Sequence, residues 1–93
     1  MPDRSSVIVV IANRLGLHAR PAMTFVERAM AFDCDVRVRR ADQDECVDGK
    51  SIMQMMMLAA TMGTPIEIVC EGPQSDAASA ALRALVESKF DEE

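Results

Sequence analysis

The sequence predicts an α+β fold in which an open sheet is covered by helices on one face. Short segments alternate between apolar and polar residues, as strands do, and longer segments repeat their apolar residues with helical spacing. The predicted order is β-α-β-β-α-β-α. Since alternating strands bury only one face, the helices should lie on one side of the sheet and solvent on the other, an open-faced β-sandwich.

Four segments are predicted to be strands. The first is the β-branched run at residues 7–11, which suits a strand better than a five-residue helix. The second contains Val36 and Val38, which alternate with arginines. Polar turn residues follow, and residues 45–48 then form a short return strand. Residues 66–71 alternate in the same way and make the fourth strand.

The first helix is expected over residues 19–32. Its apolar positions, at spacings of three and four, are Ala22, Phe25, Val26, Ala29 and Phe32. Pro21 is tolerated only in a first turn, so the helix should begin at about His18. A second helix is expected over residues 52–60, with Ser51 as its N-cap.

The third helix should follow the turn at Gly72-Pro73, with Ser75 or Asp76 as its N-cap. Its inner face is predicted from the helical repeat of Ala78, Leu82, Leu85, Val86 and Lys89/Phe90. The acidic C-terminal residues, from about 91 to 93, are expected to fray. No repeat or linker divides the chain, so residues 1–93 should form one domain.

Composition excludes several classes of function. Ten Lys and Arg face fifteen Asp and Glu, for a net charge of −5, and no Trp or Tyr is present, which argues against a nucleic-acid binder. No segment reads as a signal peptide or a membrane span. Three separated cysteines and one histidine make neither a zinc site nor a disulfide framework. We therefore expect a soluble cytoplasmic protein without metal or cofactor, with Cys34, Cys46 and Cys70 acting as small hydrophobic residues.

The most informative segment surrounds His18. A single histidine is more often a bystander than a reactive group, but this one lies where a helix should begin, after Gly16, which permits a sharp turn. The first-turn N–H groups of Ala19 and Arg20 have no intrahelical acceptor and can bind an anion. The Arg20 guanidinium adds donors suited to phosphate. A neutral imidazole here could accept a phosphoryl group and pass it on.

Methionine is the second unusual feature, with eight in the chain and several between residues 53 and 62. Met55 shares a helix face with Leu58, Ala59 and Met62 and is expected in the core. Ile52, Met53 and Met56 lie on a different arc of this helix. For these residues, spacing alone leaves core filling and partner binding equally open. The predicted docking surface consists of Met23, Ile52, Met53 and Met56.

Charged residues near this surface are interpreted in two ways. Arg14, Arg20 and Lys50 could form a basic rim that favours an acidic partner. Arg37, Arg39 and Arg40 are instead expected to form a solvated strand face. A phosphate on Ser51 would place about −2 charge beside the docking surface and block it, which is a hypothesis of regulation.

These motifs resemble those of a known family. Residues 13–22, Asn-Arg-Leu-Gly-Leu-His-Ala-Arg-Pro-Ala, look like the active-site signature of HPr, the histidine-containing phosphocarrier of the bacterial phosphoenolpyruvate:sugar phosphotransferase system. Residues 48–53, Asp-Gly-Lys-Ser-Ile-Met, are similar to the regulatory-serine segment of that family. The resemblance covers residues 7–90, nearly the whole chain, and implies an antiparallel four-stranded sheet with three helices.

The resemblance also implies roles for individual residues. His18 would be phosphorylated at Nδ1 by phospho-enzyme I and would donate to enzyme IIA domains, while Arg20 holds the phosphoryl group. Ser51 would match the serine modified by HPr kinase/phosphorylase. Ile52, Met53 and Met56 would match the docking surface of the family, and carbon regulation would accompany sugar transport. Met23 and Lys50, chosen from the helix arc and from charge, complete the predicted partner-binding residues. The methionine-rich surface and the acidic tail depart from the family pattern.

Two other functions compete with a sugar-branch carrier. One is a regulatory paralogue of the nitrogen-related branch, or an HPr of an incomplete pathway, which signals through its phosphorylation state. The other is an enzyme that uses His18 as a base or nucleophile. This alternative is disfavoured because the sequence offers no second catalytic group and the chain is too short for a substrate cavity. If the protein were such an enzyme, it would turn over a small phosphate ester without any partner protein.

Overall fold

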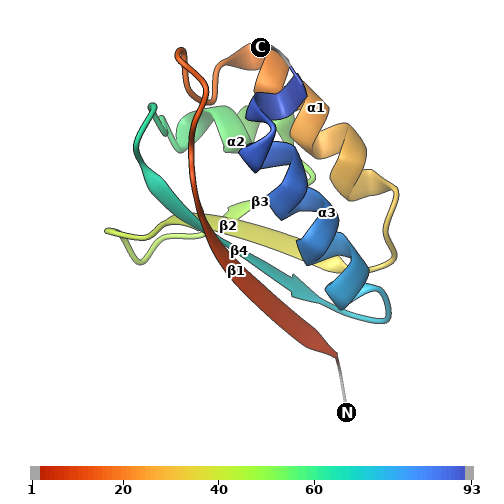
Figure 1. The fold of residues 1–93 in the computed structure, drawn as a ribbon. Coiled ribbons are helices and arrows are strands. Elements are labelled where there is room, and N and C mark those ends of the chain that lie inside the picture. Colours follow the sequence, from red (N-terminus) through yellow and green to blue (C-terminus); the bar gives the residue numbers. More distant parts are fainter. Residues whose placement is uncertain (1–2, 92–93) are drawn as a thin grey trace.

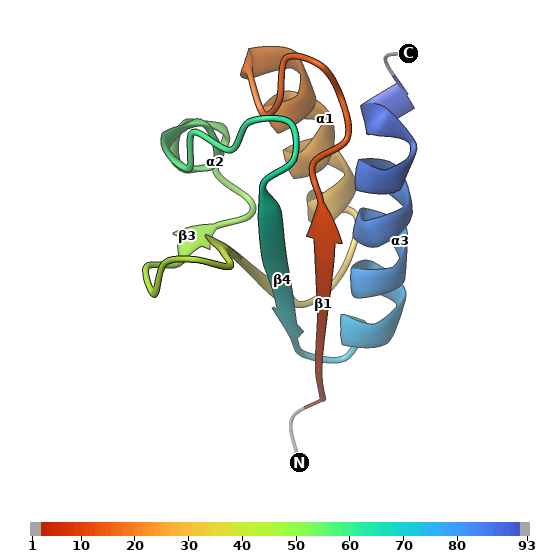
Figure 2. The same cartoon turned by 60° about the vertical axis from the view of Figure 1, so that its left-hand side comes forward.

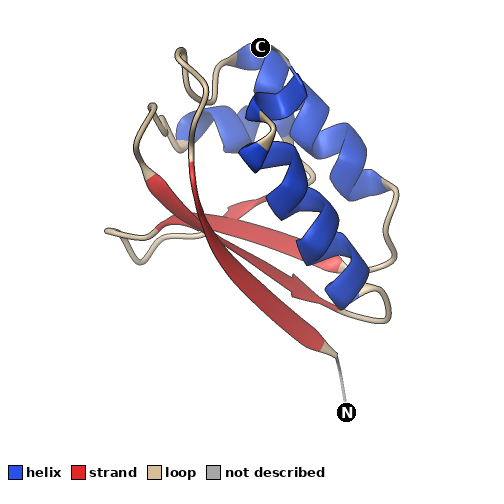
Figure 3. Cartoon of the chain, in the orientation of Figure 1, coloured by secondary structure: helices blue, strands red, loops and turns tan. Residues whose placement is uncertain are grey.

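The protein forms an antiparallel four-stranded sheet with its helices on one face (Figures 1 and 3). The structure, a computed structural model, describes residues 3–91. Its elements in chain order are β1 (Arg4–Val10), α1 (Ala19–Met30), β2 (Asp35–Arg40), β3 (Val47–Asp48), α2 (Ile52–Met57), β4 (Pro65–Glu71), α3 (Ser75–Glu87) and the 3₁₀ turn η1 (Lys89–Asp91). The predicted α+β class and element order are confirmed.

The sheet has the strand order β1-β4-β2-β3, so β4 lies between β1 and β2. Ile68 of β4 is opposite Val7 on one side and Val38 on the other. Alternation along each strand places such residues on the covered face, where Ile66, Ile68 and Val38 are completely buried. The register therefore follows from the apolar pattern, since a slip by one residue would expose this row.

The helices α1 and α3 lie along the covered face, and α2 lies beside α1 above the short strand β3 (Figure 2). The predicted inner residues of α1 are buried, including Phe25 with no exposed surface, although Phe32 is only partly buried. In α3 the predicted residues Ala78, Leu82, Leu85 and Val86 are buried as well, but the helix ends at Glu87, so that Lys89, which is partly exposed, and the buried Phe90 belong to η1. This packing fixes α1 against the sheet and so fixes the direction in which its N-terminus points.

Several predicted boundaries are wrong. The strand β1 begins at Arg4 and ends at Val10, because the polar residues at its start continue the pairing with β4. The helix α2 ends at Met57, since Ala59 has a left-handed backbone with φ of 51°. Consequently Ala59 and Met62 are exposed, whereas Met55 and Leu58 are in the core as expected.

The start of α3 also differs from the prediction. Gln74 occupies the N-cap position, and neither Ser75 nor Asp76 caps the helix. The Gln74 side chain accepts a hydrogen bond from the Asp33 N–H at 2.6 Å and so ties the start of α3 to the loop after α1.

The C-terminal end is more ordered than expected as far as residue 91. Phe90 is buried, and Asp91 accepts a hydrogen bond from the Ser88 hydroxyl at 3.0 Å. The remainder of the predicted acidic tail, residues 92–93, lies outside the described residues.

The three cysteines are not equivalent. Cys34 and Cys70 are buried, as expected of small hydrophobic residues, but Cys46 is exposed in the loop before β3, contrary to the prediction. Burial, with a smaller contribution from the neighbouring Cys34, raises the pKa of the Cys70 thiol to about 12. This thiol therefore stays protonated at neutral pH and is a poor nucleophile.

The arginines of β2 also depart from the prediction. Arg37 is exposed, but Arg39 and Arg40 are only partly exposed and are bonded within the protein. None of the helices within residues 3–91 is long and apolar enough to span a bilayer.

Candidate functional site: the N-terminus of the first helix

His18 is the N-cap residue of α1, as the position of Pro21 predicts. Its backbone is extended, with φ of −79° and ψ of −171°, and its carbonyl accepts the first hydrogen bond of the helix, from the Ala22 N–H at 3.0 Å. The His18 side chain makes no capping hydrogen bond. Pro21 has no N–H, so the first-turn amides without an intrahelical acceptor are those of Ala19 and Arg20. Both are positioned to bind an anion at the helix N-terminus.

The imidazole of His18 is partly exposed, while its Nε2 atom is enclosed by the protein. Arg20, two residues further along, is exposed. The site therefore combines an imidazole and a guanidinium that reach the surface with two backbone donors in the first turn of α1. No group of three or more His, Cys, Asp or Glu side chains between residues 3 and 91 is arranged to hold a metal ion.

The loop before His18 is held by its own buried amide. Asn13 has no exposed surface, and its Nδ2 donates to the Gly16 carbonyl at 2.7 Å. The Gly16 N–H donates in turn to the Asn13 carbonyl at 3.2 Å, and the His18 N–H donates to the Gly16 carbonyl at 3.0 Å. Sequence analysis placed Asn13 in a family motif but assigned it no role. The sequence gives only a weak indication that Asn13 is buried and holds the loop, because an Asn in a turn is rarely buried.

Gly16 is required for a reason beyond its turn. Its φ is 69°, and a Cβ built there would lie 2.5 Å from the Ala60 carbonyl oxygen and 2.8 Å from the Thr61 Cα. The next residue, Leu17, donates its N–H to that same Ala60 carbonyl at 2.8 Å. The loop that carries His18 is thus in backbone contact with the segment between α2 and β4, which lies far away in the sequence.

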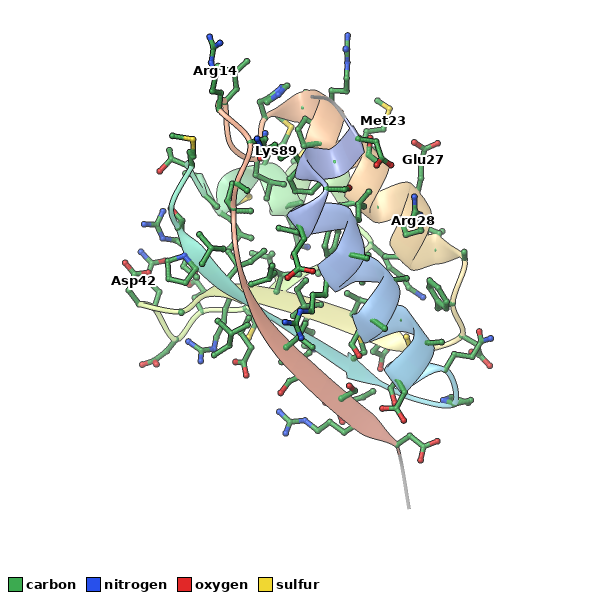
Figure 4. The ribbon with its side chains drawn as sticks, viewed as in Figure 1. Arg14, Met23, Glu27, Arg28, Asp42 and Lys89 are labelled. Atoms are coloured by element: carbon green, nitrogen blue, oxygen red, sulfur yellow. The ribbon has the colours of Figure 1, made fainter. Side chains whose placement is uncertain are left out.

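The four residues of the predicted docking surface are all exposed: Met23 by 49%, Ile52 by 38%, Met53 by 76% and Met56 by 44%. They lie on α1 and α2, which pack against each other. In Figure 4, Met23 lies near the start of α1, and Arg14 extends from the loop at the same end of the molecule. Leu15, 72% exposed in the His18 loop, and Met57, 73% exposed on α2, are further apolar candidates that the sequence analysis missed.

Lys50 and Arg20 lie near opposite ends of α1, so the predicted basic rim of Arg14, Arg20 and Lys50 is not a single cluster of charge. The Lys50 Nζ donates to the Phe32 carbonyl at 3.0 Å, beyond the C-terminal end of α1, whereas Arg20 is in the first turn. A helix of twelve residues is about 18 Å long, which separates the two charges. Ser51 caps α2 as predicted, because its Oγ accepts a hydrogen bond from the Gln54 N–H at 3.2 Å.

The open α+β sheet and the helix that begins at an accessible histidine define a class of small group-carrier proteins. The sequence model described as the PTS HPr component phosphorylation site matches residues 5–88. The chain belongs to the HPr family, the phosphocarrier proteins of the phosphotransferase system, which are carriers and not catalytic enzymes.

Relatives and solved structures agree with this membership. The chain is 51% identical to the phosphocarrier protein HPr of Pseudomonas aeruginosa over 84 residues, which are 90% of this chain and 92% of that protein. It is 41% identical to the phosphocarrier protein NPr of Escherichia coli K12 over 85 residues, 91% of this chain and 93% of that protein. A crystal structure of HPr from Thermoanaerobacter tengcongensis superposes with a TM-score of 0.88 at 39% identity, over 96% of this chain and 98% of that one.

Replacing Gly16 with Ala tests the contact between the two segments. We expect Gly16→Ala to lower the free energy of unfolding by more than about 1 kcal/mol, since it adds a backbone clash to an unfavourable φ. Gly63→Ala is the matched control, because Gly63 also has positive φ, at 91°, but a Cβ there would meet no atom within 4 Å. The measurement is chemical denaturation of both variants, and equal losses would contradict the proposed clash.

Proposed function

We propose that the protein is a phosphoryl carrier in which His18 accepts a phosphoryl group from phospho-enzyme I and passes it to enzyme IIA. The observation that carries this proposal is the imidazole at the N-cap of α1, beside the Ala19 and Arg20 amides that have no intrahelical acceptor. Family membership supports the partners, since HPr proteins work within the phosphotransferase system.

The ring atom that receives the phosphoryl group is Nδ1 in this proposal. Nε2 is enclosed by the protein, so a donor cannot approach it without moving the ring. With the proton on Nε2, the lone pair of Nδ1 attacks phosphorus; a P–N bond forms as the bond from phosphorus to the donor breaks. The two amides and the Arg20 guanidinium stabilise the charge on the phosphoryl oxygens.

A carrier must release its phosphoryl group as readily as it accepts it. The exposed position of the site allows this, because each partner supplies the other half of a closed transfer complex. The chain contains no second histidine, and the described residues contain no cluster that could bind a metal. The isolated protein is therefore expected to hold the phosphoryl group without turning over a small phosphate ester.

The docking surface for both partners is proposed to be formed by Met23, Ile52, Met53 and Met56. Methionine side chains are flexible and polarizable, so one such surface can adapt to two partners of different shape. Lys50 is retained as a candidate partner contact just before the N-cap of α2, although its ammonium group is partly held by the Phe32 carbonyl.

Ser51 is proposed as a second, regulatory phosphorylation site, for an HPr kinase/phosphorylase where one is present. Ser51 is partly exposed and lies directly before the docking residues Ile52 and Met53. A phosphate there would add about −2 charge at the edge of an apolar surface, which opposes docking.

A nitrogen-branch carrier is the second candidate function. The observation that favours it is the identity to NPr, at 41% over nearly the whole of both chains, beside 51% to an HPr. The two candidates share the chemistry of His18 and differ only in the partners that the docking surface accepts.

The first prediction under this proposal concerns His18. Incubated with phosphoenolpyruvate and enzyme I, the wild-type protein should gain one acid-labile, base-stable phosphate, and His18→Ala should gain none. Intact-mass measurement before and after acid treatment provides the readout. Ser51→Ala is the control and should still be labelled. A stable phosphate on Ser51 alone would refute His18 as the acceptor.

The second prediction concerns the docking surface. Met53→Glu should raise the KM for phospho-enzyme I by about tenfold or more, because a charge buried at the centre of an interface costs at least about 1.4 kcal/mol. Met53 is 76% exposed, so stability should change by no more than about 0.5 kcal/mol. Met30→Glu is the matched control, because Met30 is 63% exposed, ends α1 and is not among the proposed docking residues. Unchanged transfer kinetics in Met53→Glu would exclude Met53 from docking.

The third prediction separates the two branches. Phosphorylated protein, mixed with sugar-type and nitrogen-type enzyme IIA domains, should transfer its phosphate to a sugar-type domain at the higher rate. Labelled phosphate on each domain is followed over time. Transfer to the nitrogen-type domain alone would replace the sugar-branch proposal with its alternative.

A further inference from the structure

The loop that carries His18 rests on the segment between α2 and β4. Three backbone hydrogen bonds join them: Ile11 N–H to the Thr64 carbonyl (2.9 Å), Gly63 N–H to the Ile11 carbonyl (2.8 Å) and Leu17 N–H to the Ala60 carbonyl (2.8 Å). The last is the bond nearest to His18, one residue away. Gly16 approaches Ala60 so closely that no room remains for a Cβ, so the position of Ala60 constrains the position of the loop.

The turn that presents the Ala60 carbonyl is intrinsically unfavourable. We call residues 58–61 the supporting turn. Within it Ala59 has φ of 51°, a left-handed conformation that costs an L-residue about 1–2 kcal/mol. The preceding helix α2 has only six residues, and a helix this short contributes little stability of its own. Contacts from outside the turn are therefore needed to keep it in place.

Arg40, the last residue of β2, supplies such a contact. Its Nη1 donates to the Ala59 carbonyl at 3.1 Å and lies 3.5 Å from the Leu58 carbonyl. Its Nε is 3.3 Å from the Asp42 carboxylate, which orients the guanidinium. Asp42 is visible in the loop after β2 in Figure 4. A cation at the C-terminal end of α2 also interacts favourably with the helix dipole.

We propose that Arg40 is a positioning residue for phosphoryl transfer at His18, acting from β2 through the supporting turn and the Leu17–Ala60 hydrogen bond. It touches neither His18 nor the phosphoryl group. It fixes the turn whose carbonyl holds the residue next to His18, and with it the direction of the imidazole relative to the Ala19 and Arg20 amides. The proposal rests on the proposed function of His18 and adds a determinant outside the site.

The neighbouring Arg39 provides a matched control. It is equally embedded, with its Nε 2.7 Å from the Glu67 carboxylate and its Nη1 2.9 Å from the Gln43 carbonyl. Within the part of the chain that the structure describes, its hydrogen bonds go to the sheet and the β2–β3 loop, and none goes to the supporting turn. Loss of Arg39 should therefore cost stability without disturbing the His18 loop.

The test compares Arg40→Met, Arg39→Met and Arg40→Lys in the full chain. For Arg40→Met we expect kcat for phosphorylation by phospho-enzyme I to fall about tenfold with KM little changed, because a displacement of about 1 Å can cost up to about 10²-fold in rate. The Leu17 amide should exchange with solvent at least about tenfold faster. Arg39→Met should change neither, and Arg40→Lys should recover part of the rate, since an ammonium can still donate to the turn.

The outcomes separate this proposal from the proposed function. If wild type accepts no phosphoryl group, the function of His18 fails, while faster Leu17 exchange in Arg40→Met alone would still support the structural link. Unchanged Leu17 exchange in Arg40→Met would overturn the proposal. So would a rise in KM with kcat unchanged, which would place the effect in the docking surface, or equal effects of Arg39→Met and Arg40→Met.

Discussion

The loop that carries the candidate acceptor is fixed by its backbone contact with a distant segment, in which the hydrogen bond from the Leu17 N–H to the Ala60 carbonyl lies nearest to His18. An N-terminal cap residue belongs half to its helix and half to the preceding loop, so packing of α1 alone cannot fix the direction of the His18 ring. The loop must be fixed as well. Here a contact with a segment more than forty residues away in the sequence does so, and the missing side chain of Gly16 makes the approach possible.

This constraint explains why the site can be rigid and exposed at once. The rigid part consists of backbone, buried Asn13 and the close approach at Gly16, all beneath the surface. The exposed part consists of the imidazole, Arg20 and the methionine side chains, whose flexibility would suit the proposed binding of more than one partner. A carrier differs in this respect from an enzyme, whose substrate is enclosed by its own chain. In the proposed function, the enclosing surface belongs to the partner.

The sequence predicts the local features of this site better than the long-range ones. The helix start follows from Pro21, and the burial of Met55 follows from helical spacing, because both depend on neighbours within one or two turns. The contacts of Gly16 with Ala60 and of Arg40 with Ala59 join segments that are distant in the sequence, so no local sequence pattern predicts them. The sequence predicts that Arg39 and Arg40 belong to a solvated strand face. In the structure their long side chains instead donate hydrogen bonds to carbonyls of neighbouring loops.

The early end of α2 shows how the same limit affects function. Residues 52–60 have helical spacing throughout, yet the helix stops at Met57 and Ala59 turns left-handed. Local propensity favours a continued helix, but continuation would carry Ala60 away from Leu17 and leave the His18 loop without its acceptor. The left-handed backbone of the supporting turn is locally unfavourable, but it allows the long-range contact between Ala60 and Leu17. Strain at such a position is expected where a structure must hold a reactive group in one direction.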